Sequence, residues 1–236
     1  MKTIQELNRM PDCPICGNLR KIEFEDRILG KRYKNCKCTN YYKQLRFFLE
    51  DARIPSAYKL WDWDDYKPNV AEGIEEEGNR AVVKSLKEYL KRPAKKMNLL
   101  FSGPPVCGKT LLASIFMREL MLKHHYSGKF VNNNELVMLA YDYTNFKITE
   151  SETGLTFEEL VEVDVLFIEG YDKLQAKINT MSEAFIGNLI KQRVFRNKGH
   201  ILTANKNYKQ LTAAGGYTTD LINSVKYYRM FGTYKA

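Results

Sequence analysis

The chain has 236 residues, of which 44% are hydrophobic and 28% charged, and its formal net charge is +9. This length suits one medium-sized domain with a small additional module, and it is sufficient to bury a core. No apolar run approaches the roughly 20 residues that a membrane span requires, which excludes that class. The positive charge favours a polyanionic partner such as nucleic acid, although solubility alone also explains it.

The first residues, MKTIQELNRM, lack the apolar core of a signal peptide. We therefore expect a cytoplasmic protein without a membrane partner. In that compartment the five cysteines would not form structural disulfides.

Two close cysteine pairs lie near the N-terminus, in CPIC and CKC. Pairs separated by a short span supply the four thiolates that a tetrahedral zinc ion requires. The segment between them alternates as a β-hairpin does, with its turn at Leu29-Gly30. A module this small has no adequate apolar core, so metal binding would drive its folding. We predict a zinc-binding module over residues 1–50, with four unmetallated thiols as the alternative; its ligands would be Cys13, Cys16, Cys36 and Cys38.

Basic and aromatic residues alternate around the second cysteine pair. Together they could hold single-stranded nucleic acid by phosphate contact and base stacking. A solvated surface and a protein-docking surface are equally compatible with the pattern. The residues concerned are Lys31, Arg32, Tyr33, Lys34, Lys37, Tyr41 and Tyr42.

A helical pattern through YYKQLRFFLEDA stops at Ile54-Pro55. Prolines and a glycine beyond it indicate a partly ordered linker over residues 51–78, in which Trp61 and Trp63 would pack onto the following domain. That domain is assigned to residues 79–236. It opens with a helix predicted over residues 80–92, whose apolar residues form one stripe.

The segment GPPVCGKT fits the phosphate-loop pattern G-x-x-x-x-G-K-[ST]. An apolar strand at 99–101 precedes it, and an amphipathic helix over 111–123 follows. The loop amides and the helix N-terminus would form an anion site for ATP. Lys109 is expected to reach the β and γ phosphates, and Thr110 to bind Mg²⁺. The predicted nucleotide-binding residues are Gly103, Pro104, Pro105, Val106, Cys107, Gly108, Lys109, Thr110 and Leu111.

Strands and helices alternate through the rest of the chain, which is typical of a parallel α/β sheet. The predicted strands cover 129–131, 165–168, 200–203 and a terminal YYRMFG segment, and the predicted helices cover 135–143, 156–161 and 182–195. Residues 144–154 are polar and are predicted to form a loop.

The chain resembles AAA+ helicase loaders of the DnaC/DnaI type, including phage versions, and their relatives that serve transposition. The resemblance rests on the order of the cysteine pairs, an I-P-x-x-Y joint (Ile54 to Tyr58), the phosphate loop, VDVLFIEG, LIKQRVFRNKGH and ILTAN. It implies an AAA+ P-loop parallel sheet with flanking helices. It also implies Glu169 as the magnesium-holding acid and Asn205 as sensor 1, which orients the attacking water. Arg193 matches a basic position common in the family.

The strand end departs from the family pattern. Gly170 stands where a second acid would polarise the attacking water, and Asp172 would substitute only if the loop bends. Asp164 begins the strand and would lie at its far end. The predicted catalytic residues are therefore Lys109, Glu169 and Asn205, with Glu169 and Thr110 holding Mg²⁺.

The tail departs as well. The family's arginine that reaches a neighbouring subunit falls near Ser224, where no arginine stands. Lys226 or Arg229 could serve instead, although Arg229 belongs to the last predicted strand, and Lys235 falls where a sensor 2 arginine would be. Losing such groups slows turnover by orders of magnitude, so we predict firm nucleotide binding and slow hydrolysis.

The resemblance implies an ATP-controlled loader that binds a replicative DNA helicase and single-stranded DNA, with a homo-oligomer as a further possibility. ATP would act as a switch between states of different affinity. One alternative is an ATPase that selects target DNA for a transposase. Another is a regulatory AAA+ protein with little hydrolysis, which Gly170 favours.

Overall fold

The computed structural model describes residues 19, 21–26, 30–36, 38–68, 73–94, 96–144, 154–172, 180–213 and 225–233. A five-stranded sheet in the order β4-β5-β6-β3-β7 forms its centre, and every pairing in it is parallel. The predicted parallel α/β sheet is therefore confirmed. Its strands are β3 (Asn98–Ser102), β4 (Gly128–Asn132), β5 (Val165–Glu169), β6 (Gly199–Ala204) and β7 (Lys226–Arg229).

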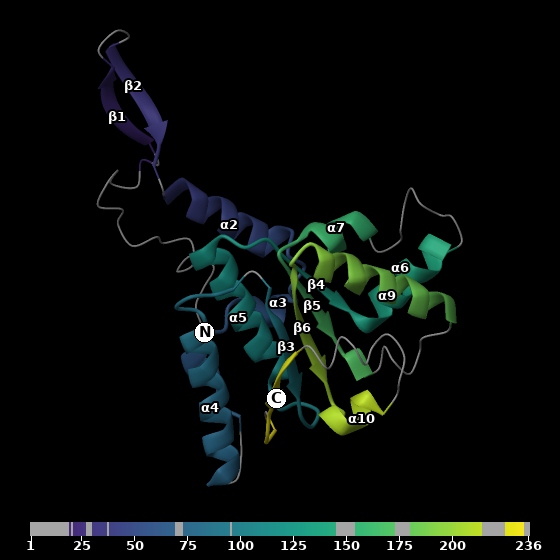
Figure 1. The fold of residues 1–236 in the computed structure, drawn as a ribbon. Coiled ribbons are helices and arrows are strands. Elements are labelled where there is room, and N and C mark those ends of the chain that lie inside the picture. The colour runs from purple at the N-terminus through teal and green to yellow at the C-terminus, as the bar shows by residue number, and fades with distance from the viewer. Residues whose placement is uncertain are drawn as a thin grey trace.

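Helices cover both faces of the sheet (Figure 1). One face packs against α4 (Ile74–Tyr89) and α5 (Lys109–His124), and the other against α6 (Asn133–Thr144), α7 (Phe157–Glu162) and α9 (Thr180–Phe195). A short helix, α10 (Tyr208–Thr212), follows β6. None of the described helices is long and apolar enough to span a membrane.

Strand β5 shows why its sequence is almost continuously apolar. Val165 and Phe167 belong to the core beside α5, whereas Leu166 and Ile168 belong to the core beside α6 and α9. Successive side chains point to opposite faces of a strand, and both faces of this sheet are covered. The strand therefore buries every residue until Glu169, which is partly exposed at its carboxyl end.

The N-terminal part forms the predicted hairpin from β1 (Lys21–Asp26) and β2 (Gly30–Asn35), which pair antiparallel. The hairpin stands away from the sheet, and every residue of β2 is exposed (Figure 1). Helix α2 (Cys38–Glu50) follows and packs on α5, with Leu45 against Leu122.

The described residues of the predicted linker, 51–68 and 73–78, contain short elements of regular structure. They include α3 (Ser56–Lys59), the 3-10 turn η1 (Trp63–Asp65) and the first turn of α4. Trp61 and Trp63 pack against the main core, as predicted. Helix α4 begins earlier than predicted because the acidic run Glu75 to Glu77 forms its first turn, where carboxylates are favourable to the helix dipole.

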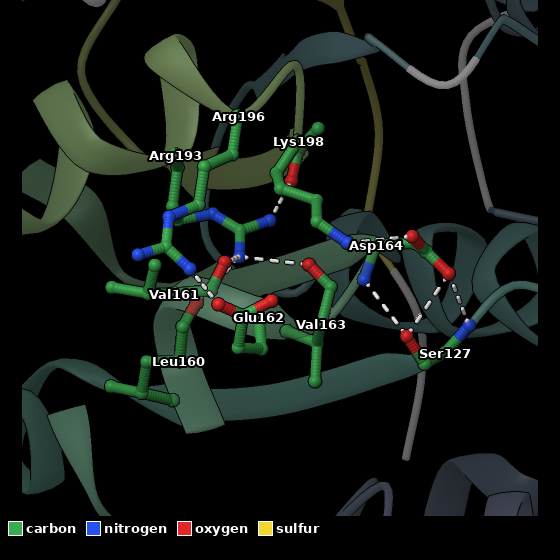
Figure 2. Close-up of polar contacts among 10 residues, drawn as sticks. Ser127, Leu160, Val161, Glu162, Val163, Asp164, Arg193, Arg196 and Lys198 are labelled. Atoms are coloured by element: carbon green, nitrogen blue, oxygen red, sulfur yellow. Dashed lines mark hydrogen bonds and ion pairs between the residues drawn. The ribbon is translucent and has the colours of Figure 1, made fainter. Parts of the chain in front are cut away.

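Arg193 proves to be a structural residue of this fold. It is fully buried and donates hydrogen bonds to the carbonyls of Leu160, Val161, Val163 and Gly199 (Figure 2). These contacts tie the end of α9 to the end of α7 and the start of β6. Burial lowers the pKa of Arg193 to about 9, so the side chain stays charged at neutral pH.

Asp164 lies in the same region, at the start of β5 and far from the strand's carboxyl end, as predicted. Its carboxylate accepts hydrogen bonds from the backbone and hydroxyl of Ser127 at 3.0 Å and pairs with Lys198 at 2.9 Å (Figure 2). Arg193 and Asp164 therefore stabilise the amino-terminal edge of the sheet.

Candidate nucleotide-binding site

The phosphate loop joins β3 to α5 and depends on its two glycines. A Cβ at Gly103 would lie 2.3 Å from the carbonyl oxygen of Met230, so only glycine fits there. Gly108 has φ 85°, a left-handed conformation that glycine adopts without strain, and it caps α5. The helix begins at Lys109, so its first amides face the loop.

Lys109 folds back onto the loop. Its Nζ donates hydrogen bonds to the carbonyls of Gly103 at 3.0 Å and Pro104 at 2.6 Å, and it lies 3.6 Å from Cys107 Sγ. Burial lowers the pKa of Lys109, whereas Cys107 and the carboxylates of Asp172 and Glu169 oppose that shift. The Lys109 side chain is thus held at the phosphate loop by backbone carbonyls, in the same pocket as two carboxylates.

The two predicted magnesium ligands meet directly. Thr110 Oγ1 donates a hydrogen bond to Glu169 Oε1 at 2.5 Å. No cluster of three or more His, Cys, Asp or Glu side chains that could hold a metal occurs among the described residues. Mg²⁺ with a bound nucleotide needs only one or two protein oxygens, because phosphates and waters complete its shell. A hydroxyl and a carboxylate side by side fit that requirement.

The chain bends sharply after β5. Gly170 has φ 70°, and its N–H donates to Thr203 Oγ1 at 3.1 Å on the neighbouring strand β6. The bend brings Asp172 to the pocket, where its Oδ1 accepts a hydrogen bond from the backbone N–H of Asn205 at 3.1 Å. The condition set for Asp172 from the sequence, a bent loop, is therefore met.

These groups line one pocket of about 720 Å³ at the carboxyl ends of β3, β5 and β6. Its wall includes Lys109, Thr110, Glu169, Asp172 and Asn205. Four further predicted loop residues line the pocket: Pro105, Val106, Gly108 and Leu111. Gly103 and Pro104 do not line it but accept hydrogen bonds from Lys109. Cys107 is buried.

Sequence reasoning missed one wall of this pocket. The joint contributes Ala57, Tyr58 and Trp61, and the start of α6 contributes Asn133. Burial and the charge of Glu169 raise the pKa of Tyr58, so its hydroxyl stays protonated. The I-P-x-x-Y pattern was the available signal, but a local pattern does not show that the segment folds over the phosphate loop.

A buried arginine of α5 holds this wall in place. Arg118 donates to the carbonyl of Trp61 at 2.5 Å and that of Lys59 at 3.5 Å, and it pairs with Asp62 at 3.1 Å. The helix that begins at the phosphate loop therefore also positions the opposite wall of the pocket.

Several predicted residues lie elsewhere or outside the described part. Cys36 and Cys38 are buried together against Ile22, whereas Cys13 and Cys16 lie outside the described residues. Lys226 and Arg229 belong to β7 and do not line the pocket: Lys226 contacts Ser85 Oγ at 3.0 Å, and Arg229 lies over the Phe231 ring. Ser224 and Lys235 also lie outside the described residues.

Solved structures of replication proteins share this fold. The DnaC helicase loader matches with a TM-score of 0.59 at 15% identity, covering 75% of this chain and 100% of that one. DnaI matches with a TM-score of 0.56 at 17% identity, covering 76% and 95%. DnaA from Aquifex aeolicus bound to AMPPCP matches with a TM-score of 0.57 at 15% identity, covering 75% of this chain and 51% of that one.

No protein-family model and no curated protein matches the sequence. At these identities the solved structures establish the fold alone. The five-stranded parallel sheet with helices on both faces is thus the fold that this chain shares with those DnaC, DnaI and DnaA structures.

Proposed function

We propose that this protein is an ATP-binding AAA+ helicase loader that acts in the initiation of DNA replication. The observation that carries the proposal is the convergence of Lys109, Thr110, Glu169 and Asn205 on one pocket at the carboxyl ends of three strands. Ligands of open α/β sheets bind at that edge. The pocket volume of about 720 Å³ lies in the range of small-molecule sites.

The chain's own groups account for ATP binding with Mg²⁺. Lys109 would exchange the carbonyls of Gly103 and Pro104 for phosphate oxygens, and the first amides of α5 would bind the same anion. Thr110 and Glu169 would hold Mg²⁺, which neutralises charge on the phosphates. Asn205, at the end of β6, would lie beside the γ phosphate.

The partners are proposed by likeness. DnaC is a helicase loader, and a DnaA structure that shares the fold contains AMPPCP and single-stranded DNA. By analogy we assign this chain a replicative helicase, single-stranded DNA and further copies of itself as partners. Bound ATP would favour one state of the loader over another, so that slow hydrolysis is compatible with a switch.

The N-terminal module is proposed to bind zinc and to dock the helicase. The burial of Cys36 and Cys38 side by side, at the end of the hairpin and the start of α2, is the supporting observation. Two neighbouring thiolates are half of a Cys₄ zinc site, and Cys13 and Cys16 would complete it.

The test is the affinity of the purified full chain for a fluorescent ATP analogue with Mg²⁺. Lys109→Ala removes charge-assisted hydrogen bonds to phosphate, so we expect affinity to fall about 10- to 100-fold. Lys84→Ala, an exposed lysine on α4, serves as the control and should bind as the unaltered protein does. Equal affinity of Lys109→Ala and the unaltered protein would refute nucleotide binding at this pocket.

Partner identity separates the loader from the transposition ATPase. Purified replicative helicase should coprecipitate with the chain in the presence of ATP, and purified transposase should not. The reverse result would favour target selection in transposition.

A further inference from the structure

The pocket proposed to bind nucleotide contains a second carboxylate besides the partly exposed Glu169, and this one is buried at a position that the strand motif does not predict. Asp172 is 7% exposed and lines the same pocket as Glu169, Lys109 and Asn205. Burying a charged carboxylate is costly unless it is hydrogen-bonded or paired. An acid retained at such a place, inside a cleft lined by phosphate-binding groups, is a candidate for chemistry.

Gly170 explains how Asp172 reaches this place. The strand ends at Glu169, and the next residue takes a left-handed conformation that costs most residues about 1–2 kcal/mol and glycine almost nothing. A larger residue at 170 would strain this turn. Glycine lets the chain reverse at once, so that Tyr171 is buried and the carboxylate of Asp172 lies in the pocket wall.

The contacts of Asp172 link it to both sides of the predicted reaction centre. Its Oδ1 accepts the backbone N–H of Asn205, the residue at the end of β6 that faces the pocket. Lys109, the predicted phosphate-binding ammonium, lines the same pocket, and the charge of Asp172 acts to raise its pKa. The carboxylate therefore shares the pocket with both groups that would contact a terminal phosphate.

We propose that Asp172 is the general base of a slow ATP hydrolysis, in place of an acid at position 170. This inference rests on the proposed nucleotide binding. One carboxylate oxygen of Asp172 keeps its hydrogen bond from the backbone N–H of Asn205, and the other accepts a proton from the attacking water. The water oxygen bonds to the γ phosphorus as the bond from that phosphorus to the β,γ-bridging oxygen breaks. ADP leaves with the bond's electron pair, and the proton passes from Asp172 to phosphate or solvent.

A purely structural role is the competing explanation, since Asp172 anchors the Asn205 backbone. Asp172→Asn distinguishes the two roles because the amide oxygen can still accept the Asn205 N–H, whereas the amide cannot take a proton from water. A general base contributes about 10²- to 10⁴-fold to a rate. If Asp172 only anchors the Asn205 backbone, Asp172→Asn keeps that hydrogen bond and the hydrolysis rate should not change.

The experiment measures single-turnover ATP hydrolysis and ATP-analogue affinity on the full chain, alone and with single-stranded DNA. For Asp172→Asn we expect affinity within about threefold of the unaltered protein and a hydrolysis rate lower by about 100-fold or more. Asp51→Asn, an exposed aspartate after α2, is the matched control and should leave both quantities unchanged.

A second pair of variants covers the case in which Asp172→Asn fails to fold. Asp172→Glu and Asp172→Gln share the same added length, and they differ only in the proton-accepting group. The Glu variant should hydrolyse ATP at least about tenfold faster than the Gln variant. Equal rates in this pair, or an unchanged rate in Asp172→Asn, overturn the proposal.

Two outcomes separate this inference from the proposed function. If the unaltered protein binds ATP but hydrolyses it no faster than Lys109→Ala, the role of Asp172 is refuted while nucleotide binding stands. If the unaltered protein binds no adenine nucleotide, both proposals are refuted.

Discussion

Arg193 and His200 are buried next to one another, but they differ in protonation: Arg193 carries its charge and His200 is neutral. Arg193 is charged and has four carbonyl acceptors, which together offset its desolvation. His200 lies on β6 with no exposed surface, and its Nε2 has no hydrogen-bond partner. Burial, followed by the charges of Arg193 and Lys96, lowers the pKa of His200 to about 3. The imidazole is therefore neutral in the folded protein throughout the physiological range.

This difference predicts an acid-sensitive fold. An unfolded histidine has a pKa of about 6.5, so below that pH the unfolded state takes up a proton that the folded state does not. The free energy of unfolding should therefore fall as the pH drops from about 6.5 toward 3. Between pH 7 and pH 5 this single group should account for about 2 kcal/mol.

Urea unfolding of the unaltered protein and of His200→Leu at the two pH values measures this contribution. The leucine variant should lose about 2 kcal/mol less between pH 7 and pH 5, since the other titrating groups are common to both proteins. Parallel losses in the two proteins would show that the pKa of His200 in the folded state is not lowered by burial.

At the scale of elements, α5 organises the site from two directions. Its N-terminus follows the phosphate loop, and Arg118, near its middle, holds residues 59–62 across from that loop. Among the described residues between α2 and α4, the regular elements are the short helix α3 and the 3-10 turn η1. The position of the wall formed by Tyr58 and Trp61 therefore depends in part on this buried guanidinium, together with the packing of both residues against the main core.

Arg118→Met should test that dependence. Methionine keeps much of the apolar stem but leaves two carbonyls and Asp62 without their donor, which should cost about 3 kcal/mol of stability. ATP-analogue affinity should also fall severalfold, because the wall of the pocket loosens. Urea unfolding and fluorescence titration measure the two effects.

The control for Arg118 is an exposed arginine with a surface ion pair. Arg46 pairs with Glu50 on α2, and Arg46→Met should leave the urea midpoint close to that of the unaltered protein, because exposed ion pairs contribute little. Unchanged nucleotide affinity in a folded Arg118→Met protein would show that the wall does not take part in binding.

The elements themselves were largely predictable, and the contacts between them were not. Apolar runs and glycines located every strand of the sheet and the phosphate loop, because hydrophobic periodicity and backbone sterics act locally. The α5 start was misplaced by the apolar pattern, which begins at Leu111, after the helical residues Lys109 and Thr110. Arg118 and Asp62 meet only through the tertiary fold, so no local pattern could reveal the pocket's second wall.

At the scale of the molecule, far more apolar side chains are buried around the sheet than around the hairpin among the described residues. The sheet and its helices enclose two extensive apolar cores, whereas the region around the hairpin buries only Cys36 and Cys38 with partial cover from Ile22 among the described residues. Helix α2 connects the two parts and rests on α5 through Leu45 and Leu122. The sheet and its helices are therefore stabilised by extensive apolar burial, of which the described residues of the hairpin region offer very little.

We propose that bound zinc stabilises the predicted N-terminal module, so that zinc removal should affect this part of the chain alone. Because so little apolar surface is buried there, the free energy of zinc binding would be most of the module's folding energy. A chelator, or Cys36→Ser together with Cys38→Ser, should abolish bound zinc and helicase coprecipitation. ATP-analogue affinity should stay within about threefold, since the pocket lies in the sheet domain.

Cys107→Ser is the matched control, because this cysteine is buried in the phosphate loop and not in the hairpin region. It should retain one zinc per chain by elemental analysis, as the unaltered protein should. The N-terminal zinc site is refuted if the unaltered chain contains no zinc. It is also refuted if zinc remains bound after both Cys36 and Cys38 are replaced. Coprecipitation of helicase by the doubly substituted chain would instead place the docking surface outside the zinc module.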